Sequence, residues 1–125
     1  MRAAATVLAI ALEVTLILVV VGDFNDTKES APVKAIVGRG KKKLVDTRPV
    51  ERKTESSEAA QESRAITWTH YYEKDDTYSR IDFLLLSPGM AREWVTNETR
   101  ILSIPGWGLA SDHRPLLATF AAEDK

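Results

Sequence analysis

The sequence contains no cysteine in its 125 residues, which excludes disulfide bonds, thiolate zinc sites and cysteine nucleophiles. It also lacks an excess of charge of either sign, because 17 basic residues stand against 18 acidic ones, for a net charge of −1. A protein that coats a polyanion with its whole surface is therefore excluded, and any contact with nucleic acid must be local. No internal repeat is visible. The length and the 44% hydrophobic content predict one globular domain with a buried core.

Residues 3–21 are apolar apart from two threonines and Glu13. One interpretation is a helix over about residues 2–12 followed by a strand at 16–21, and the other is a signal peptide or membrane anchor. Glu13 disfavours the anchor, because a charged side chain near the centre of a bilayer costs about 2.5–3.5 kcal/mol. We therefore expect a helix plus a strand within residues 2–21, no membrane span, and a cytoplasmic rather than an exported protein.

Residues 16–26, LILVVVGDFND, change abruptly from apolar to polar. The continuous run of leucine, isoleucine and valine predicts a fully buried strand. Gly22 would let the backbone turn or approach a neighbour closely. Asp23, Asn25 and Asp26 then offer oxygen ligands and amide donors for a divalent cation or a phosphate, at the end of a strand where ligands of open sheets bind. The alternative is an ordinary Asx turn.

Residues 39–53 form the most basic segment, with seven lysines and arginines against Asp46 and Glu51. Contact with a phosphate backbone is one interpretation, and a solvated loop is the one we favour. Residues 54–63 have no aliphatic side chain larger than alanine. We therefore expect a basic and mobile loop over residues 39–63.

The remaining elements are predicted from turn residues and from β-branched and aromatic patterns. They are a short helix capped by Ser30, with Pro32 in its first turn and Gly38 and Gly40 at its end; strands at 65–72, 79–87, 99–104 and 116–121 within a sheet region of 64–121; a turn at 73–78; one or two helical turns over 88–95 around Trp94; and a loop at 105–108. The strand at 79–87 carries Asp82 between two apolar residues. Since an unpaired buried carboxylate is costly, Asp82 must have a partner.

Three polar clusters, at 22–26, 80–82 and 111–113, each adjoin a predicted strand. Hydrolysis of a phosphodiester needs an activated water, a divalent cation and donors to the nonbridging oxygens. His113 is a candidate base, and Asp82 could fix its tautomer. The other candidates are Asp23 and Asp112, to orient water or bind metal, and Asn25, to donate its amide to phosphate.

The same clusters carry a family resemblance. GDFND at 22–26, RIDFLLLS at 80–87 and SDHRPLLATF at 111–120 resemble, in this order, the three C-terminal motifs of the endonuclease/exonuclease/phosphatase superfamily. That superfamily includes DNase I-like nucleases, abasic-site endonucleases, sphingomyelinases and inositol polyphosphate phosphatases. The resemblance implies an α/β fold, namely the C-terminal half of a two-sheet α/β sandwich (DNase I-like) with its active site at one edge. It also implies a phosphoester hydrolase that uses Mg²⁺ or Mn²⁺ on a nucleic acid, a lipid headgroup or a small phosphate.

The resemblance further implies a role for each motif residue. Asp23 would position the nucleophile or protonate the leaving group, Asn25 would bind the scissile phosphate, and Asp82 would pair with the catalytic His113. Asp112, together with Asp23, would lie at the metal site.

The chain departs from the family pattern in its first half. The family's N-terminal half supplies a metal-binding glutamate, an asparagine and a second histidine or tyrosine, for which Glu13 is a poor substitute. His70, in a predicted strand, is expected to be structural, and Trp68, Trp94 and Trp107 to pack in the core or in loops. We therefore expect a partial domain over residues 1–125 that needs a complementing N-terminal half, the alternative being a non-catalytic remnant that binds phosphate or a partner.

Overall fold

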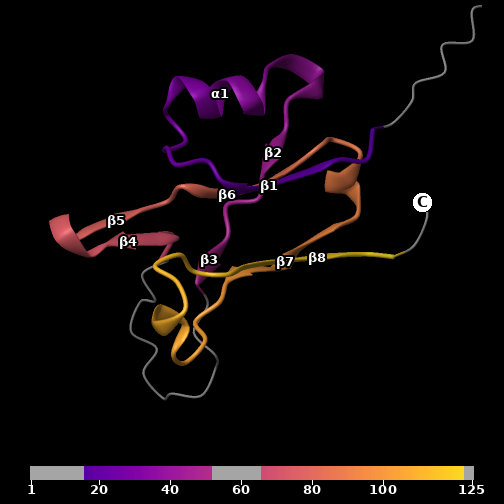
Figure 1. Ribbon diagram of the computed structural model, residues 1–125. Helices are drawn as coiled ribbons and strands as arrows, with labels where there is room; N and C mark the ends of the chain where they lie inside the picture. Colours follow the sequence, from indigo (N-terminus) through magenta and orange to yellow (C-terminus); the bar gives the residue numbers. More distant parts are fainter. Residues whose placement is uncertain (1–15, 52–65, 123–125) are drawn as a thin grey trace, which may run out of the picture.

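The computed structural model describes residues 16–51 and 66–122. In these residues it contains two three-stranded sheets, one two-stranded hairpin and one α-helix (Figure 1). The helix expected at 2–12, most of the alternative membrane anchor and the mobile loop expected at 54–63 lie outside the described residues. Within them, no helix has both the length and the apolar character needed to cross a membrane.

The first sheet holds its strands in the order β1 (Val19–Asp23), β6 (Asp82–Leu86) and β2 (Val45–Asp46). Both outer strands run antiparallel to β6. The register places Val19 opposite Leu86 and Asp23 opposite Asp82. Since β1 ends at Asp23 and β6 begins at Asp82, two of the three polar clusters meet at one end of this sheet.

The helix α1 (Ala31–Val37) lies on one face of the first sheet (Figure 1). Ser30 caps it, since its hydroxyl accepts a hydrogen bond from the Val33 amide at 3.4 Å. Proline in the first turn needs no amide partner, and Gly38, with φ of 77°, ends the helix. The expected helix is therefore confirmed, except that Gly40 begins a short 3₁₀ turn, η1 (Gly40–Lys42), instead of belonging to the helix end.

The strand β6 is buried on both of its faces. Phe83 and Leu85 pack with Val33 of α1 into the core, and they are 1% and 0% exposed. Side chains alternate along a strand, so Leu84 and Leu86 point to the opposite face, where the second sheet lies (Figure 1). The fully buried strand of this protein is thus β6.

The expectation that residues 16–21 form a fully buried strand is wrong. The strand runs from Val19 to Asp23, and Val21 and Leu16 are each 62% exposed. In the described part of the chain β1 pairs only with β6, so its other edge carries no strand. The apolar run predicts the strand, but burial depends on what covers it. Among the described residues, no atom lies within 4 Å of the place where a Cβ on Gly22 would stand, but its φ of +146° is one that residues with a side chain rarely adopt.

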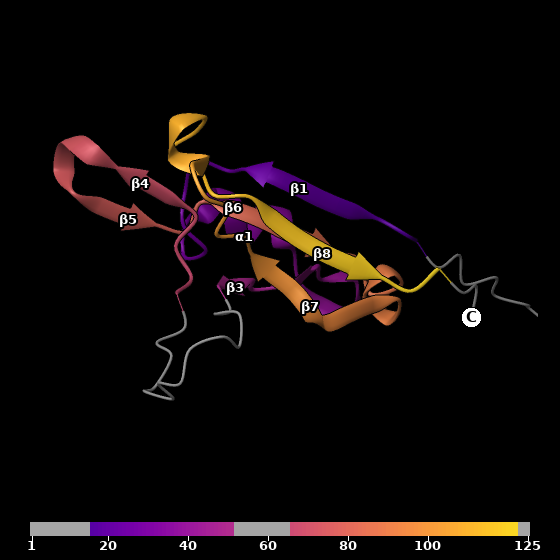
Figure 2. The ribbon, with the colours of Figure 1, turned by 90° about the horizontal axis from the view of Figure 1, so that it is seen from below.

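The second sheet has the order β3 (Val50–Glu51), β7 (Trp94–Ile101) and β8 (Leu116–Phe120). β3 runs parallel to β7, and β8 runs antiparallel to it (Figure 2). The final strand is therefore confirmed. The helical turns expected over 88–95 are limited to η3 (Met90–Arg92), and the strand expected at 99–104 instead begins at Trp94, because residues 94 and 95 pair with β8.

Two short strands, β2 and β3, replace part of the loop expected over residues 39–63. Each is only two residues long and is held by pairing with a distant strand, β6 or β7. Sequence patterns are weak over such short elements, because tertiary pairing decides them. The loop prediction is therefore wrong for these four residues.

A hairpin of β4 (His70–Tyr72) and β5 (Thr77–Ser79) projects from the sheets (Figure 2). The turn η2 (Glu73–Asp75) connects the two strands, and a left-handed residue, Asp76, follows it. The strands expected at 65–72 and 79–87 are both shorter than predicted, since β4 begins only at residue 70 and β6 covers only residues 82–86. A bridge between His70 and His113 ties the hairpin to the loop before β8.

Aromatic rings pack beside this hairpin. The ring centroid of Trp68 lies 5.0 Å from that of Tyr78 and 6.1 Å from that of Trp107. Trp107 belongs to the 3₁₀ turn η4 (Trp107–Leu109), in the loop expected at 105–108. The guanidinium of Arg114 lies over Trp68 at 4.5 Å. Trp94 instead donates a hydrogen bond to Thr99 within β7. The expectation that the tryptophans pack in the structure is confirmed.

Candidate active site

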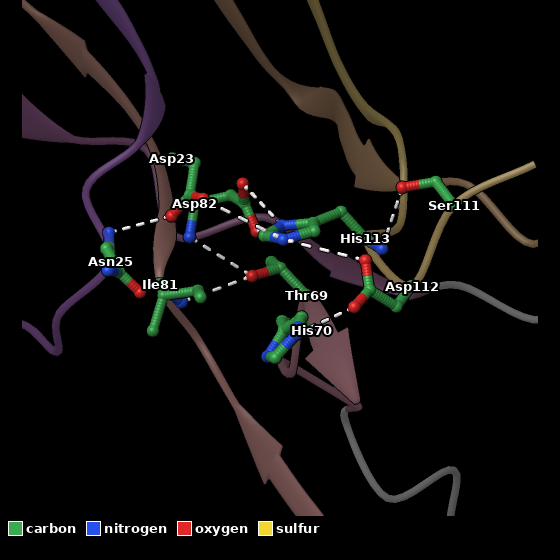
Figure 3. Close-up of polar contacts among 9 residues, drawn as sticks. All are labelled: Asp23, Asn25, Thr69, His70, Ile81, Asp82, Ser111, Asp112 and His113. Atoms are coloured by element: carbon green, nitrogen blue, oxygen red, sulfur yellow. Dashed lines mark hydrogen bonds and ion pairs between the residues drawn. The ribbon is translucent and has the colours of Figure 1, made fainter. Parts of the chain in front are cut away.

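The structure brings His113 to the end of β1 and the start of β6 (Figure 3). Its ring Nδ1 lies 2.9 Å from Oδ2 and 3.1 Å from Oδ1 of Asp82. The Asp82 side chain is only 14% exposed. His113 is therefore the partner that this largely buried carboxylate was expected to need. In the neutral imidazole this contact holds the proton on Nδ1, where it is donated to Asp82, and leaves the lone pair on Nε2.

The free nitrogen of His113 faces two further carboxylates. Nε2 lies 3.8 Å from Oδ2 of Asp23 and 3.9 Å from Oδ1 of Asp112. These side chains are 47% and 64% exposed, so the space between them is open to solvent. The imidazole therefore has an orienting acid on one nitrogen and a solvent-accessible acidic rim at the other.

Asn25 lies at the same rim, next to Asp23 (Figure 3). Its backbone adopts a left-handed conformation with φ of 51°, and its backbone N–H donates a hydrogen bond to Oδ1 of Asp23 at 2.7 Å. The Asx turn weighed as an alternative is thus present, and it leaves the side chain of Asn25 exposed. Asp26 is not brought to His113, because its carboxylate accepts a hydrogen bond from the amide of Thr27 instead.

Thr69 holds the backbone segments that carry Asp82 and His113, and nothing in the sequence pattern predicts this role. It is fully buried, and its hydroxyl oxygen accepts hydrogen bonds from the amides of Ile81 at 3.2 Å and Asp82 at 3.1 Å. Its carbonyl accepts from the amide of Arg114 at 2.7 Å. One threonine thereby holds the start of β6 and the segment that carries His113. A threonine in a strand is common, so the pattern alone does not distinguish it.

His70 also lies at the site, which the strand pattern did not indicate. Its Nε2 is 3.3 Å from Oδ2 of Asp112, and its ring centroid is 4.6 Å from that of His113. The position is therefore not that of a histidine buried for packing alone. The sequence does contain one signal, since the chain has two histidines in all and both lie here.

The surrounding carboxylates raise the pKa of His113. Burial alone lowers it, but the hydrogen bond to Asp82 and the charges of Asp82, Asp23 and Asp112 outweigh burial, so the pKa lies above its ordinary value of 6.5. A histidine that binds its proton more tightly in the folded state adds stability fully below pH 6.5, and that stability is lost as the pH rises through the folded pKa.

Replacing Asp82 with asparagine is expected to lower the pKa of His113, because the amide removes the largest favourable contact of the imidazolium. The measurement is an NMR titration of the two histidine rings in the presence of a chelator, with Asp75→Asn, on the exposed hairpin turn, as the matched control. The control should leave the His113 titration where it is in the unmodified protein. An unchanged pKa in the Asp82 variant would contradict the coupling.

The fold and site together define a class of protein: an α/β fold whose strand ends carry a histidine oriented by one aspartate and flanked by two more. The sequence profile of the Endonuclease/Exonuclease/phosphatase family matches residues 2–113. The chain therefore belongs to this family, and its α/β fold is consistent with part of a DNase I-like sandwich. No curated protein and no solved structure matches the chain significantly.

Family membership identifies the chain as part of a phosphoesterase-type superfamily whose members generally depend on divalent metal ions and act on phosphoesters such as nucleic acids. Two groups of three side chains in the described residues offer donor atoms within 4.8 Å of one another: His70, Asp112 and His113, and Asp23, Asp82 and His113. Both groups share His113. The carboxylates and imidazoles of this rim thus have the composition of a cation site.

Proposed function

We propose that this chain is a phosphoester hydrolase whose catalytic base is His113. The observation that carries the proposal is the contact of His113 Nδ1 with Asp82 at 2.9 Å, which turns the unprotonated Nε2 towards Asp23 and Asp112. This is the arrangement of a general base held by an orienting acid. Since the acids beside Nε2 are exposed, water and a phosphoester can reach it.

In this proposal each side chain has a separate task. His113 takes the proton from the attacking water at Nε2, and Asp82 stabilises the imidazolium that results. Asp23 orients that water or returns a proton to the leaving oxygen. The exposed amide of Asn25, next to Asp23 in the turn, donates to a nonbridging oxygen of the scissile phosphate.

Asp112 and Asp23 are the residues that would hold Mg²⁺ or Mn²⁺. Their donor type fits, because hard cations prefer carboxylate ligands and Mg²⁺ keeps several waters, for which two exposed side chains leave room. When bound, the ion neutralises charge that develops on the phosphoryl oxygens. Without it, the two carboxylates would repel an anionic substrate.

We further propose that a complementing N-terminal half contributes to the active protein. Two aspartates are few ligands for a divalent cation, and a further carboxylate from outside the described residues would strengthen the site. β1 supports the same idea, since its outer edge carries no strand among the described residues and Val19, Val21 and, before the strand, Leu16 expose apolar side chains. A non-catalytic protein that binds phosphate is the second candidate, because Asn25 and His113 would serve that role without a metal.

Hydrolysis of a generic phosphodiester by the purified full chain tests the function. The assay is run on the chain alone and with a family N-terminal half added in trans, and we expect turnover with Mg²⁺ or Mn²⁺ when that half is present and none after addition of a chelator. An inert protein that is well folded by NMR, and that stays inert with a family N-terminal half added in trans, would favour the phosphate-binding alternative.

A further inference from the structure

We propose that His70, Asp112 and His113 form a binding site for a transition-metal ion such as Zn²⁺, which shares Asp112 with the aspartate pair assigned to Mg²⁺ but adds two imidazole ligands in place of Asp23. The three residues come from two elements, β4 and the loop before β8, which the bridge between His70 and His113 holds together. One donor atom from each lies within 4.8 Å of the others. His70 has no part in the proposed hydrolysis, so this site gives it a role.

The separations suit a tetrahedral ion. Bonds of about 2.0–2.2 Å place neighbouring ligand atoms about 3.3–3.6 Å apart. Nε2 of His70 lies 3.3 Å from Oδ2 of Asp112, and Nε2 of His113 lies 3.9 Å from Oδ1 of the same side chain. The first separation is in this range and the second is slightly longer; the Asp112 carboxylate is 64% exposed, so it has room to adjust when an ion binds. Water would complete the coordination.

A second observation points to a metal at the same place. Asp82 accepts from Nδ1 of His113, so the lone pair on Nε2 faces Asp112. A carboxylate bonded to the outer nitrogen of a histidine is the arrangement that orients histidine ligands in metal sites and raises their basicity. His113 is therefore held ready to bind an ion before one arrives.

The donor set selects the type of metal. Two imidazoles and one carboxylate suit Zn²⁺ and its transition-metal neighbours, whereas Mg²⁺ prefers oxygen ligands throughout. An ion here would also occupy the lone pair that His113 needs as a base. If the proposed function holds, Zn²⁺ should therefore inhibit the Mg²⁺-supported reaction, and this consequence alone rests on that proposal.

Metal titration of the full chain tests the site without any activity measurement. Zn²⁺ binding is followed by calorimetry, and Co²⁺ binding by its visible absorption, which reports tetrahedral nitrogen and oxygen ligation. We expect one ion per chain, with affinity lowered by more than about 100-fold in His70→Gln, which exceeds the loss typical for an outer-shell partner. Asp75→Asn, on the exposed hairpin turn, is the matched control and should bind Zn²⁺ as the unmodified chain does, whereas Asp23→Asn, whose carboxylate lies beside His113 but outside the trio, should weaken binding far less than His70→Gln.

The outcomes separate the possible assignments. Weaker binding in Asp23→Asn with unchanged binding in His70→Gln would place the ion on the trio of Asp23, Asp82 and His113 and would overturn the proposal. An absence of Zn²⁺ binding by the folded chain would also overturn it. If Zn²⁺ binds as expected but no hydrolysis is ever detected, the metal site stands and the hydrolase proposal fails.

Discussion

Replacing His113 with alanine is expected to lower phosphodiester hydrolysis by about 10²–10⁴-fold, the usual contribution of a positioned general base. The ring is held by Asp82 and is the only imidazole with both an orienting acid and a solvent-facing nitrogen among the described residues. The rate is measured with saturating Mg²⁺ or Mn²⁺. Glu98→Gln, an exposed position on β7, is the control and should keep the full rate.

The pH dependence of the same reaction supplies a second readout. A base acts only in its neutral form, and the neighbouring carboxylates raise the pKa of His113. The rate should therefore increase with pH through a midpoint above 6.5. An alanine variant that folds and retains the rate and pH profile of the unmodified chain would overturn the assignment of His113.

Replacing Glu51 with alanine is expected to lower the free energy of unfolding by about 3–5 kcal/mol, because it would strand a buried cation. The Arg114 side chain is 3% exposed, and its Nη2 lies 2.8 Å from Oε2 of Glu51. Two of its other nitrogens, Nε and Nη1, are buried and have no hydrogen-bond partner within the described part of the chain. Stacking over Trp68 compensates only part of this desolvation.

Urea denaturation measures this effect, with Glu98→Gln as the surface control, for which a change within about 0.5 kcal/mol is expected. The double variant Glu51→Leu/Arg114→Met removes both charges and should lose much less than Glu51→Ala, since apolar replacement of a buried pair is often close to neutral. A loss below 1 kcal/mol in Glu51→Ala would show that water, rather than Glu51, satisfies Arg114.

Among the described strands, β1 pairs only with β6, so its outer edge is available for another strand. An exposed apolar strand is a place where another strand can add. In the described residues, Val20 packs towards α1 while Val19 and Val21 are 37% and 62% exposed on the opposite face. A complementing half that covers this face would explain why the apolar run at 16–21 is largely exposed.

Motif residues were more predictable from the sequence than the elements between them. Asp82 was expected to need a partner because it sits in an apolar strand, and His113 is that partner. The helix after Ser30 was predictable from its cap and its proline, which act locally. In contrast, β2, β3 and the start of β7 depend on partners far away in the chain, so local patterns placed them in loops or turns.

The sequence by itself determined the family, the helix cap and the chemical groups of the candidate site, because these depend on residue identity and on short-range spacing. Only the tertiary structure decided that His70 and Thr69 belong beside that site and that β6, rather than β1, is the buried central strand. The physical reason is that burial and convergence depend on which segments pack together. A run of valines has the same local pattern whether its outer face is covered or exposed.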